Sequence, residues 1–460
     1  MHYASDDTSG HPKGLYLLFT TEMWERMSYY GMRALLTLYM VAQTDKGGFG
    51  WDKKYALQVY GIYTGLVYVT PLLGGWLADR FLGLRRSVLL GGTLMMIGHF
   101  LMAVPGQAAF FAALGFLIFG NGFFKPNIST MVGGLYRPGD ARRDGAFTIF
   151  YMGINAGAFL GGAVSGTLGE KVGWHWGFAA AGVGMALGLA CFVPFAKRFL
   201  GDVGLAPKPR VADEMPADSA PLTSHELQRL AVIFILSLFV MVFWAAFEQA
   251  GGLFNIYTNE KVDRMLGGFE VPASWFQNLN PVFIVLLGPV FSAIWTGLAK
   301  RGKDLSIPMK IAVGILFASS GFGVMLGAAA VTATGAKASM LWLVATYFLH
   351  TVGELCLSPV MLSMVTKLAP KKYAALMMGT MFLVANACGN YLAGFIGGFA
   401  DELGEYQLFT GIAVVTAVTA VGLMGLAPLL RKMMHGADAI TPADSSHGGA
   451  HAPAAEPTAA

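Results

Sequence analysis

Apolar stretches of about 20 residues recur along most of this 460-residue chain. A helix of about 20 apolar residues crosses the ~30 Å hydrocarbon core of a bilayer, and it satisfies its own backbone hydrogen bonds there. Only 13% of the residues are charged, whereas soluble proteins average about 25%. We therefore predict an all-α membrane protein with twelve transmembrane helices, at about 14–42, 55–78, 87–105, 108–135, 145–167, 175–196, 227–258, 275–298, 307–330, 338–366, 373–399 and 406–430.

The Lys and Arg residues predict how the chain is oriented in the membrane. Of the 31 basic residues, 20 fall on the side of the N-terminus and the even-numbered connections, 7 on the other side and 4 within the spans. Loops rich in Lys and Arg stay in the cytoplasm. Both termini are therefore predicted to be cytoplasmic.

The longest internal connection divides the predicted spans into two sets of six. This connection, at 197–226, is rich in Pro, Ala and Asp. A weak repeat supports the division, since residues 75–80 (GWLADR) after the second span resemble residues 296–301 (TGLAKR) after the eighth. Repeated halves are typical of membrane transporters. We predict a six-helix bundle at 1–196, a cytoplasmic linker at 197–226, a second six-helix bundle at 227–435 and a disordered tail at 436–460.

Ionisable residues lie within the predicted spans, where each one costs roughly 2.5–3.5 kcal/mol on insertion scales. Such residues normally face the bundle interior and mark a route for an ion or a substrate. They are Glu22, Glu25, Arg26, Arg33 and Lys125 in the first half, and Glu248 and Glu354 in the second. Equivalent helices thus carry basic groups in the first half and acidic groups in the second. Lys310 lies near the cytoplasmic end of its span, where snorkelling explains it.

This division of charge predicts the kind of substrate. Sites in repeat-built transporters lie near the bilayer midplane, at the interface between the repeats. A cavity there would have a cationic wall and an anionic wall, which suits a small zwitterion. We expect its carboxylate to face Arg33 and Lys125, and its amine to face Glu354. Without substrate, Arg33–Glu248 and Lys125–Glu354 pairs would lower the cost of burying the charges.

The stretch Glu22-x-x-Glu25-Arg26 predicts a proton site. Spacings of three and four residues place these side chains on one face of a helix. Two carboxylates beside one guanidinium cannot all remain ionised cheaply in a low dielectric, so one of them should take a proton readily. A proton that crosses with the substrate draws about 2.3 kcal/mol per 100 mV of membrane potential. The pattern therefore favours active symport over facilitated diffusion.

Residues 22–31 (EMWERMSYYG) resemble the ExxERFxYYG signature of the proton-dependent oligopeptide transporters, a branch of the major facilitator superfamily. Met27 replaces the signature's Phe at an apolar packing position. Further motifs match the family in order along nearly the whole chain, at residues 74–83, 123–129, 150–159, 244–249, 276–281 and 353–359. Many bacterial members insert two helices between the halves, but about 30 residues are too few for that.

The resemblance implies proton-driven uptake of di- and tripeptides by alternating access, across a bacterial inner (plasma) membrane. It assigns roles to the matching residues. Those that would hold the peptide carboxylate are Tyr30, Arg33 and Lys125. Those that would hold the amino end are Asn155, Asn280 and Glu354. Those that would couple protons are Glu22, Glu25, Arg26 and Glu248. Those that would line the substrate pockets are Tyr68, Tyr151, Trp244 and Ser358, and those that would brace the cytoplasmic gate are Asp79 and Arg80.

Other functions remain open from the sequence. A relative that carries nitrate or another organic anion is the nearest alternative, but a nitrate carrier has no use for an anionic wall at Glu354. A membrane-bound sensor or scaffold would bind without accumulation and would not need Glu22, Glu25 and Arg26. An enzyme is disfavoured because no His-Glu-x-x-His pair or similar catalytic motif occurs. We expect no metal, no cofactor other than the coupling proton, no nucleic-acid partner and a functional monomer in the lipid bilayer.

Overall fold

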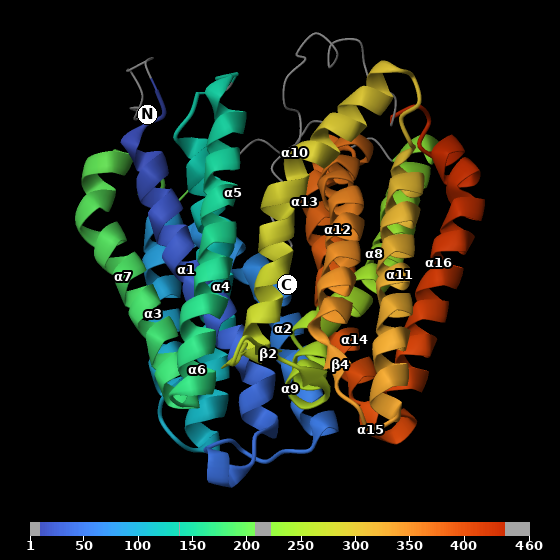
Figure 1. Cartoon of the computed structure of the whole chain (residues 1–460). Helices are drawn as coiled ribbons and strands as arrows, with labels where there is room; N and C mark the ends of the chain where they lie inside the picture. The colour runs from blue at the N-terminus through green and yellow to red at the C-terminus, as the bar shows by residue number, and fades with distance from the viewer. Residues whose placement is uncertain (1–9, 138, 208–221, 438–460) are drawn as a thin grey trace. The chain divides into compact units, whose positions relative to one another are not determined.

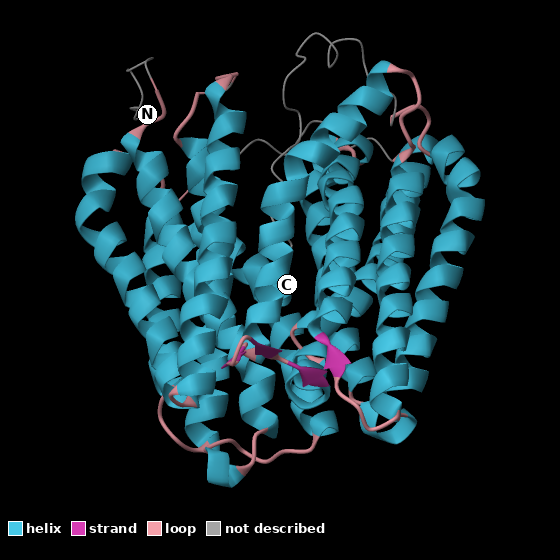
Figure 2. Ribbon diagram, in the orientation of Figure 1, coloured by secondary structure: helices cyan, strands magenta, loops and turns pink. Residues whose placement is uncertain are grey.

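A computed structural model describes residues 10–137, 139–207 and 222–437. Helices cover every one of the twelve predicted spans, and the few strands are two residues long (Figure 2). Within the described residues, ten helical runs are long and apolar enough to cross a membrane. The two predicted spans outside those ten are α1 (Lys13–Val41) and α3 (Leu84–Met102).

The chain divides into two compact units whose boundaries do not follow the sequence halves alone. The first unit comprises residues 1–209, 251–260 and 264–282, and the second comprises 210–250, 261–263 and 283–460. The predicted linker begins within a helix that continues to Leu200, and its residues 208–221 lie outside the described part of the chain. The predicted tail lies outside it from residue 438 onward.

The first unit is built around α1 (Figure 1). It also contains η1 (Thr44–Lys46), α2 (Lys53–Leu77), the π-helix η2 (Ala78–Leu82), α3, α4 (Gln107–Gly134), α5 (Arg142–Gly161), the π-helix η3 (Gly162–Gly166), α6 (Thr167–Lys171), α7 (Trp174–Leu200), α9 (Leu253–Lys261, as far as residue 260), β2 (Met265–Leu266), β3 (Phe269–Glu270) and η5 (Ala273–Asn278). Strands β2 and β3 pair antiparallel. Helix α1 packs against α5 and α7, and α3 packs against α4.

Glycines on α5 allow α1 to approach closely. Gly153, Gly157 and Gly161 are one turn apart and face α1. A Cβ at Gly157 would overlap the carbonyl oxygen of Met23, and a Cβ at Gly161 would lie 2.6 Å from the backbone nitrogen of Gly31. Small residues in lipid let helix backbones touch, which replaces hydrophobic burial as the source of packing energy.

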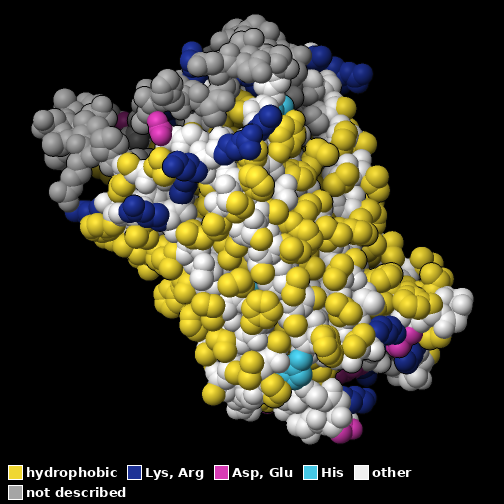
Figure 3. All heavy atoms as spheres, turned by 90° about the vertical axis from the view of Figure 1, so that its left-hand side faces the viewer, with side chains coloured by type: hydrophobic (Ala, Val, Ile, Leu, Met, Phe, Trp, Pro, Cys, Tyr) yellow, Lys and Arg dark blue, Asp and Glu magenta, His cyan; other side chains and the backbone are white. Residues whose placement is uncertain are grey.

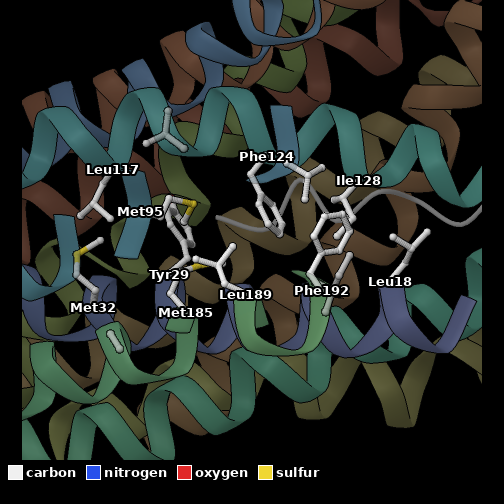
Figure 4. Packing of buried hydrophobic residues seen from close by; sticks show 14 of the residues in the cluster. Leu18, Tyr29, Met32, Met95, Leu117, Phe124, Ile128, Met185, Leu189 and Phe192 are labelled. Atoms are coloured by element: carbon white, nitrogen blue, oxygen red, sulfur yellow. The ribbon is translucent and has the colours of Figure 1, made fainter. Parts of the chain in front are cut away.

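The core of the first unit fills the space between α1, α3, α4 and α7 (Figure 4). Tyr29 of α1 lies beside Met95 of α3 and Met185 of α7, and Met32 of α1 and Phe124 of α4 belong to the same buried cluster. All five side chains are at most 2% exposed. Dispersion contacts between such closely packed side chains are individually weak but add up over the whole cluster.

The second unit is a second set of helices (Figure 1). It comprises α8 (Ser224–Phe247), η4 (Glu248–Ala250), β1 (Val262–Asp263), α10 (Leu279–Lys300, from residue 283), α11 (Ile307–Ala333), β4 (Ala338–Ser339), α12 (Met340–Leu368), η6 (Lys371–Tyr373), α13 (Ala374–Met381), the π-helix η7 (Phe382–Ala387), α14 (Cys388–Gly397), α15 (Ala400–Leu403) and α16 (Glu405–Met433). Strand β1 pairs parallel with β4. A capping box between Thr223 and Glu226 begins α8.

The surface of the first unit beside α7 has the distribution of side chains that a bilayer requires. Hydrophobic side chains cover the middle of this face, and charged side chains gather toward its two ends (Figure 3). On α7, Val183, Leu187, Val193 and Phe195 are 41–57% exposed. An exposed apolar band of this kind is stable only against lipid or a partner surface.

Candidate functional site

The charged side chains of α1 form one buried cluster, as their spacing predicts. Arg26 Nε lies 2.9 Å from Glu22 Oε1 and also pairs with Glu25. The three side chains are at most 2% exposed. The Arg26 guanidinium also lies 5.6 Å from the ring centroid of Tyr29. One guanidinium therefore pairs with two carboxylates inside the bundle.

Two turns further along α1, Arg33 is held by a residue that the sequence did not single out. Its Nε donates to the hydroxyl of Tyr60 on α2 at 2.8 Å, and its guanidinium carbon lies 5.7 Å from the Tyr60 ring centroid. Arg33 is 3% exposed and Tyr60 is fully buried. Gly251 packs directly against both side chains, because a Cβ there would overlap the Tyr60 hydroxyl. The guanidinium is thus oriented by an aromatic hydroxyl.

Lys125 and Tyr68, both predicted site residues, meet in the first unit. The Lys125 Nζ on α4 lies 4.9 Å from the centroid of the Tyr68 ring on α2. A cation over a ring face gains about 0.5–2 kcal/mol, depending on how well it is desolvated. Glu25 is attracted electrostatically to Lys125 in addition to Arg26. This interaction links the acidic cluster of α1 to the predicted carboxylate-binding lysine.

The remaining substrate-binding residues predicted in the first unit are buried or partly buried. Tyr30 and Tyr151 are partly buried, and the Tyr30 ring packs edge-on against Tyr29 at 5.3 Å. Asn155 is 6% exposed and donates from Nδ2 to the carbonyl of Tyr151, at 3.0 Å, within α5. Asn280, at the start of α10, is partly buried. This bond within the helix uses the side-chain nitrogen of Asn155 and does not involve its side-chain oxygen.

The acidic residues predicted for the second half lie in the second unit. Glu248 is fully buried in η4, where α8 ends. Glu354 and Ser358 are 4% and 6% exposed and lie one turn apart on α12. Trp244 is fully buried on α8, between the rings of Phe243 and Phe247. Arg33 and Lys125 belong to the other unit, so their predicted pairing with Glu248 and Glu354 stays a prediction.

The predicted gate residues Asp79 and Arg80 lie in the π-helix η2 at the end of α2. Asp79 is partly buried, whereas Arg80 is exposed and lies against Trp76 and Phe81, at 5.6 Å and 5.8 Å from their ring centroids. Single π-turns occur frequently at functional sites. The bracing role of these two residues stays a prediction.

A set of polar contacts that the sequence did not predict joins residues 251–282 to the first six spans, within the first unit. Thr37 Oγ1 donates to the carbonyl of Gly251 at 3.0 Å. Asn255 Nδ2 donates to the carbonyl of Ala34 at 2.8 Å. Lys53 pairs with Glu260 at 2.7 Å. Helix α9 is therefore attached to α1 and α2 by backbone and side-chain bonds.

Glu170 on α6 is the centre of a second group of these contacts. Its carboxylate accepts the backbone N–H groups of Ala273 and Ser274, at 2.7 Å and 2.8 Å, where η5 begins. The Arg264 guanidinium lies 3.6 Å away, and the two side chains are only 8% and 9% exposed. Glu270 also pairs with Arg264, at 2.9 Å, but is half exposed. A carboxylate at a helix start satisfies N–H groups that have no partner within the helix.

The connection between α4 and α5 contains a perturbed carboxyl group outside the spans. Asp140 accepts hydrogen bonds from the Arg142 side chain at 2.8 Å and 3.0 Å, and from its backbone N–H at 2.9 Å. These bonds lower the pKa of Asp140 to about 2. Arg142 also donates to the carbonyl of Gly10 at 2.7 Å, which attaches the start of the described chain to this loop.

Among the described residues, no group of three or more His, Cys, Asp or Glu side chains is placed to hold a metal ion. The charged groups on α1 have bonding partners within the protein, since Arg26 pairs with Glu22 and Glu25 and Arg33 donates to the Tyr60 hydroxyl. Buried charges of this kind in a polytopic helical protein with repeated halves define a membrane transporter.

Comparison with known proteins identifies the family. A sequence model of the POT family matches residues 85–211 and 211–409. The peptide transporter YePEPT of Yersinia enterocolitica is 39% identical over 490 residues, which cover 93% of this chain and 96% of that protein. A di-/tripeptide transporter of Lactococcus lactis subsp. cremoris is 33% identical over 484 residues, covering 92% of this chain and 97% of that protein. The crystal structure of a peptide transporter POT in complex with sulfate matches with a TM-score of 0.87 and 38% identity, over 93% of this chain and 97% of that chain.

The chain belongs to the POT family. This confirms the resemblance inferred from its motifs and the major facilitator fold that the resemblance implied. It also confirms that the protein is a transporter rather than an enzyme.

Proposed function

We propose that the protein is a proton-coupled symporter that imports di- and tripeptides by alternating access of its two halves. The observation that carries the proposal is the buried cluster of Glu22, Glu25 and Arg26 on α1. Such a cluster is costly in a membrane protein unless it has a role in transport. The family supports the peptide class, since its relatives include transporters of peptides and of di- and tripeptides.

The carboxylate end of the peptide would bind to the basic residues of the first half. Arg33 and Lys125 supply the positive charge, and Tyr30 supplies a hydroxyl donor. Tyr60 orients Arg33 by accepting a 2.8 Å hydrogen bond from its Nε, and the terminal guanidinium nitrogens would bind the carboxylate. Tyr68 would restrict Lys125 through its ring face. Two cations held by neighbouring groups need little reorganisation to receive an anion.

The amino end of the peptide would bind to the acidic residue Glu354 of the second half, with Asn155 and Asn280 as further acceptors. The nearly buried position of Glu354 gives its carboxylate a low-dielectric setting, in which attraction to an ammonium group is strong. The peptide would thus lie between a basic wall and an acidic wall. The side chains proposed to line the rest of the site are Tyr68, Tyr151, Trp244 and Ser358.

Proton coupling would use Glu22, Glu25, Arg26 and Glu248. Protonation of Glu22 or Glu25 removes one of the two negative charges beside Arg26 and leaves a simple ion pair. That change alters the charge balance next to Lys125, with which Glu25 interacts. Binding of a peptide carboxylate at Lys125 and proton uptake at the cluster would therefore influence each other. Each proton that enters with the peptide contributes about 2.3 kcal/mol per 100 mV.

The coupling is tested by uptake of labelled dialanine into liposomes under an inward proton gradient, with and without an ionophore. Arg26→Gln and Glu22→Gln should abolish uphill accumulation while counterflow exchange is partly retained. Arg86→Gln, at an exposed arginine on α3, is the matched control and should accumulate normally. Uphill uptake by Arg26→Gln at the native level would refute the coupling role of the cluster.

The substrate assignment is tested by binding. Lys125→Ala should weaken binding of dialanine, because one of the two cations for the carboxylate is lost. An N-acetylated dipeptide should bind poorly to the unmutated protein, because it cannot present an ammonium group to Glu354. Equal binding of blocked and free dipeptides would exclude Glu354 as the amine contact.

We further propose that the protein lies in a bacterial inner membrane, with both termini in the cytoplasm, and functions as a monomer without a cofactor other than protons. The excess of Lys and Arg on one set of connections supports this orientation. Asp79 and Arg80 would then stand at the cytoplasmic end of α2 and brace the gate there. Impermeant labelling of single cysteines in these connections, in intact cells, tests the orientation.

A further inference from the structure

In the second unit, α8 packs against the π-helix η7 and α14, and η4, which follows α8, also packs against α14. Asn386 and Asn390 lie one turn apart, with Gly389 between them. A Cβ at Gly389 would lie 2.8 Å from Cβ of Trp244, so the two helices approach closely here. On the α8 side, Gln249 Nε2 donates to the carbonyl of Ala393 at 2.9 Å. We call Trp244, Gln249, Asn386 and Asn390 the amide seam.

The amide seam contains polar atoms that no group of the described protein satisfies. They are Nε1 of Trp244, Oε1 of Gln249, both amide atoms of Asn386 and Oδ1 of Asn390. All four side chains are at most 1% exposed. Buried polar groups in proteins are almost always hydrogen-bonded, because an unmade bond costs the full desolvation of the group. Several such atoms in one helix interface therefore indicate a bound polar molecule.

The set of atoms defines the chemistry of that molecule. The seam offers donors from the indole and from the Asn386 amide, and acceptors from three side-chain carbonyl oxygens. A ligand that donates and accepts, and that is small enough for a closely packed helix interface, is water. The π-turn of η7 changes the register of the helix at Asn386, which is how helices commonly accommodate such inserted groups.

We propose that the amide seam binds internal water and that this water relays protons to and from Glu248. The relay rests on the proposed coupling role of Glu248. Glu248 directly precedes Gln249, is fully buried and lies in η4, against which α14 packs. In release, the Glu248 carboxylic acid gives its proton to the nearest water and becomes a carboxylate, each water passes one of its own protons to the next, and the last water releases a proton to the solvent; uptake is the reverse. The amides hold the waters in line and do not titrate.

Other titratable groups adjoin this part of the second unit. Helix α12 also packs against α8 and carries His350 and Glu354. The ring of His350 lies 6.0 Å from that of Phe247.

Helix α16, which packs on α8 as well, carries Thr416 as a buried hydroxyl whose bonds stay within its own helix. Thr416 therefore offers a control site with buried polarity but no place in the seam.

The variants Asn386→Leu and Asn390→Leu test the proposal, with Thr416→Val as control. The melting temperature distinguishes an amide seam that holds water from one that does not. Replacing an unsatisfied amide by Leu is neutral or stabilising, whereas removing an amide that holds water lowers the melting temperature. We expect both Asn variants to melt earlier than Thr416→Val. A map that resolves ordered water should also show density within hydrogen-bond distance of both amides in the unmutated protein.

Transport tests the relay separately. Proton-driven uptake of dialanine by Asn390→Leu should fall at least tenfold, with a much smaller change in counterflow, while Thr416→Val changes neither. The whole inference would be overturned if the two Asn variants melt no earlier than Thr416→Val and the map shows no water density in the seam. If the unmutated seam holds water but Asn390→Leu takes up dialanine normally under a proton gradient, the relay is refuted and the water site is not. If the unmutated protein shows no gradient-driven uptake, the proposed coupling and the relay both fail. The water density then still tests whether the amide seam binds water.

Discussion

Glu170 provides a test of the proposed alternating access. Its carboxylate accepts the N–H groups of Ala273 and Ser274 and faces Arg264, so it joins α6 to a segment from the second half of the sequence. Alternating access requires contacts between the halves at each end to separate in turn. By the predicted orientation this end faces away from the cytoplasm. Glu170→Gln should therefore favour the state that is open on that side.

The size of the effect follows from the bonds that change. A glutamine can accept one of the two N–H groups through its carbonyl oxygen, but its NH₂ group faces the other and leaves it without an acceptor. The charge opposite Arg264 is lost as well. A hydrogen bond to a charged group contributes about 1.5–3 kcal/mol, and together with the nearly buried ion pair we expect about 2–4 kcal/mol. At tenfold per 1.4 kcal/mol, the open population rises about 30- to 700-fold.

The assay is the labelling rate of a buried reporter by an impermeant maleimide added from outside. Ser274→Cys is a suitable reporter because Ser274 is fully buried, in a background that lacks Cys191, Cys356 and Cys388. Glu170→Gln should raise its labelling rate by at least tenfold.

Glu270→Gln is the matched control for Glu170→Gln. It removes the same charge from the same Arg264, but Glu270 is 50% exposed. An exposed pair contributes about 0.2–1 kcal/mol, so the control rate should rise less than about fivefold. Equal rates for the two variants would refute the reasoning, because burial and the backbone bonds would then make no difference.

Two further substitutions test the packing of the first unit and a contact at the end of the second. Gly157→Ala should destabilise the protein by about 1–3 kcal/mol, because its Cβ would overlap the backbone of α1; Gly115→Ala, with no atom within 4 Å of its Cβ, should not, and thermal unfolding compares the two. His435 stacks on His225 at 3.9 Å, and burial, then His225 and a nearby arginine, lower its pKa from 6.5. Because the folded state favours the neutral ring, this contact is intact above about pH 6.5 and is lost as the pH falls through the lowered pKa. The protection factors of the amides at residues 430–437 against hydrogen exchange should fall with acidification in the native protein but not in His435→Phe.

The cluster on α1 was predictable because helical geometry alone fixes it. Glu22 and Arg26 are four residues apart, so a helix brings them together whatever surrounds it. Six motifs in order then predicted the fold, because each one fell on the expected helix. The partner of Arg33 was not predictable in this way. Tyr60, Tyr63 and Tyr68 all lie on α2, and nothing in their spacing distinguishes the one that meets Arg33.

The grouping of residues 251–282 with the first unit was not predictable either. The Pro- and Ala-rich linker marks the division of the sequence, but contacts between distant segments decide which residues pack together. Glu170 follows the predicted span 145–167, and no motif around it indicates a role. Its role depends on two backbone N–H groups about 100 residues away in the sequence. A single sequence contains no signal for such a side-chain-to-backbone contact.

The position of α1 explains how one helix can carry four buried charges. Glycines at 153, 157 and 161 bring α5 against it, and α7 covers another face, so the charges face protein rather than lipid. Arg26 pairs with two carboxylates, and Tyr60 accepts a hydrogen bond from Arg33, so each of these charged side chains has a bonding partner. The cluster is nevertheless one positive charge short of neutralising both glutamates. That imbalance would favour proton binding at Glu22 or Glu25, and it would place the proposed proton site next to the lysine proposed to bind the peptide carboxylate.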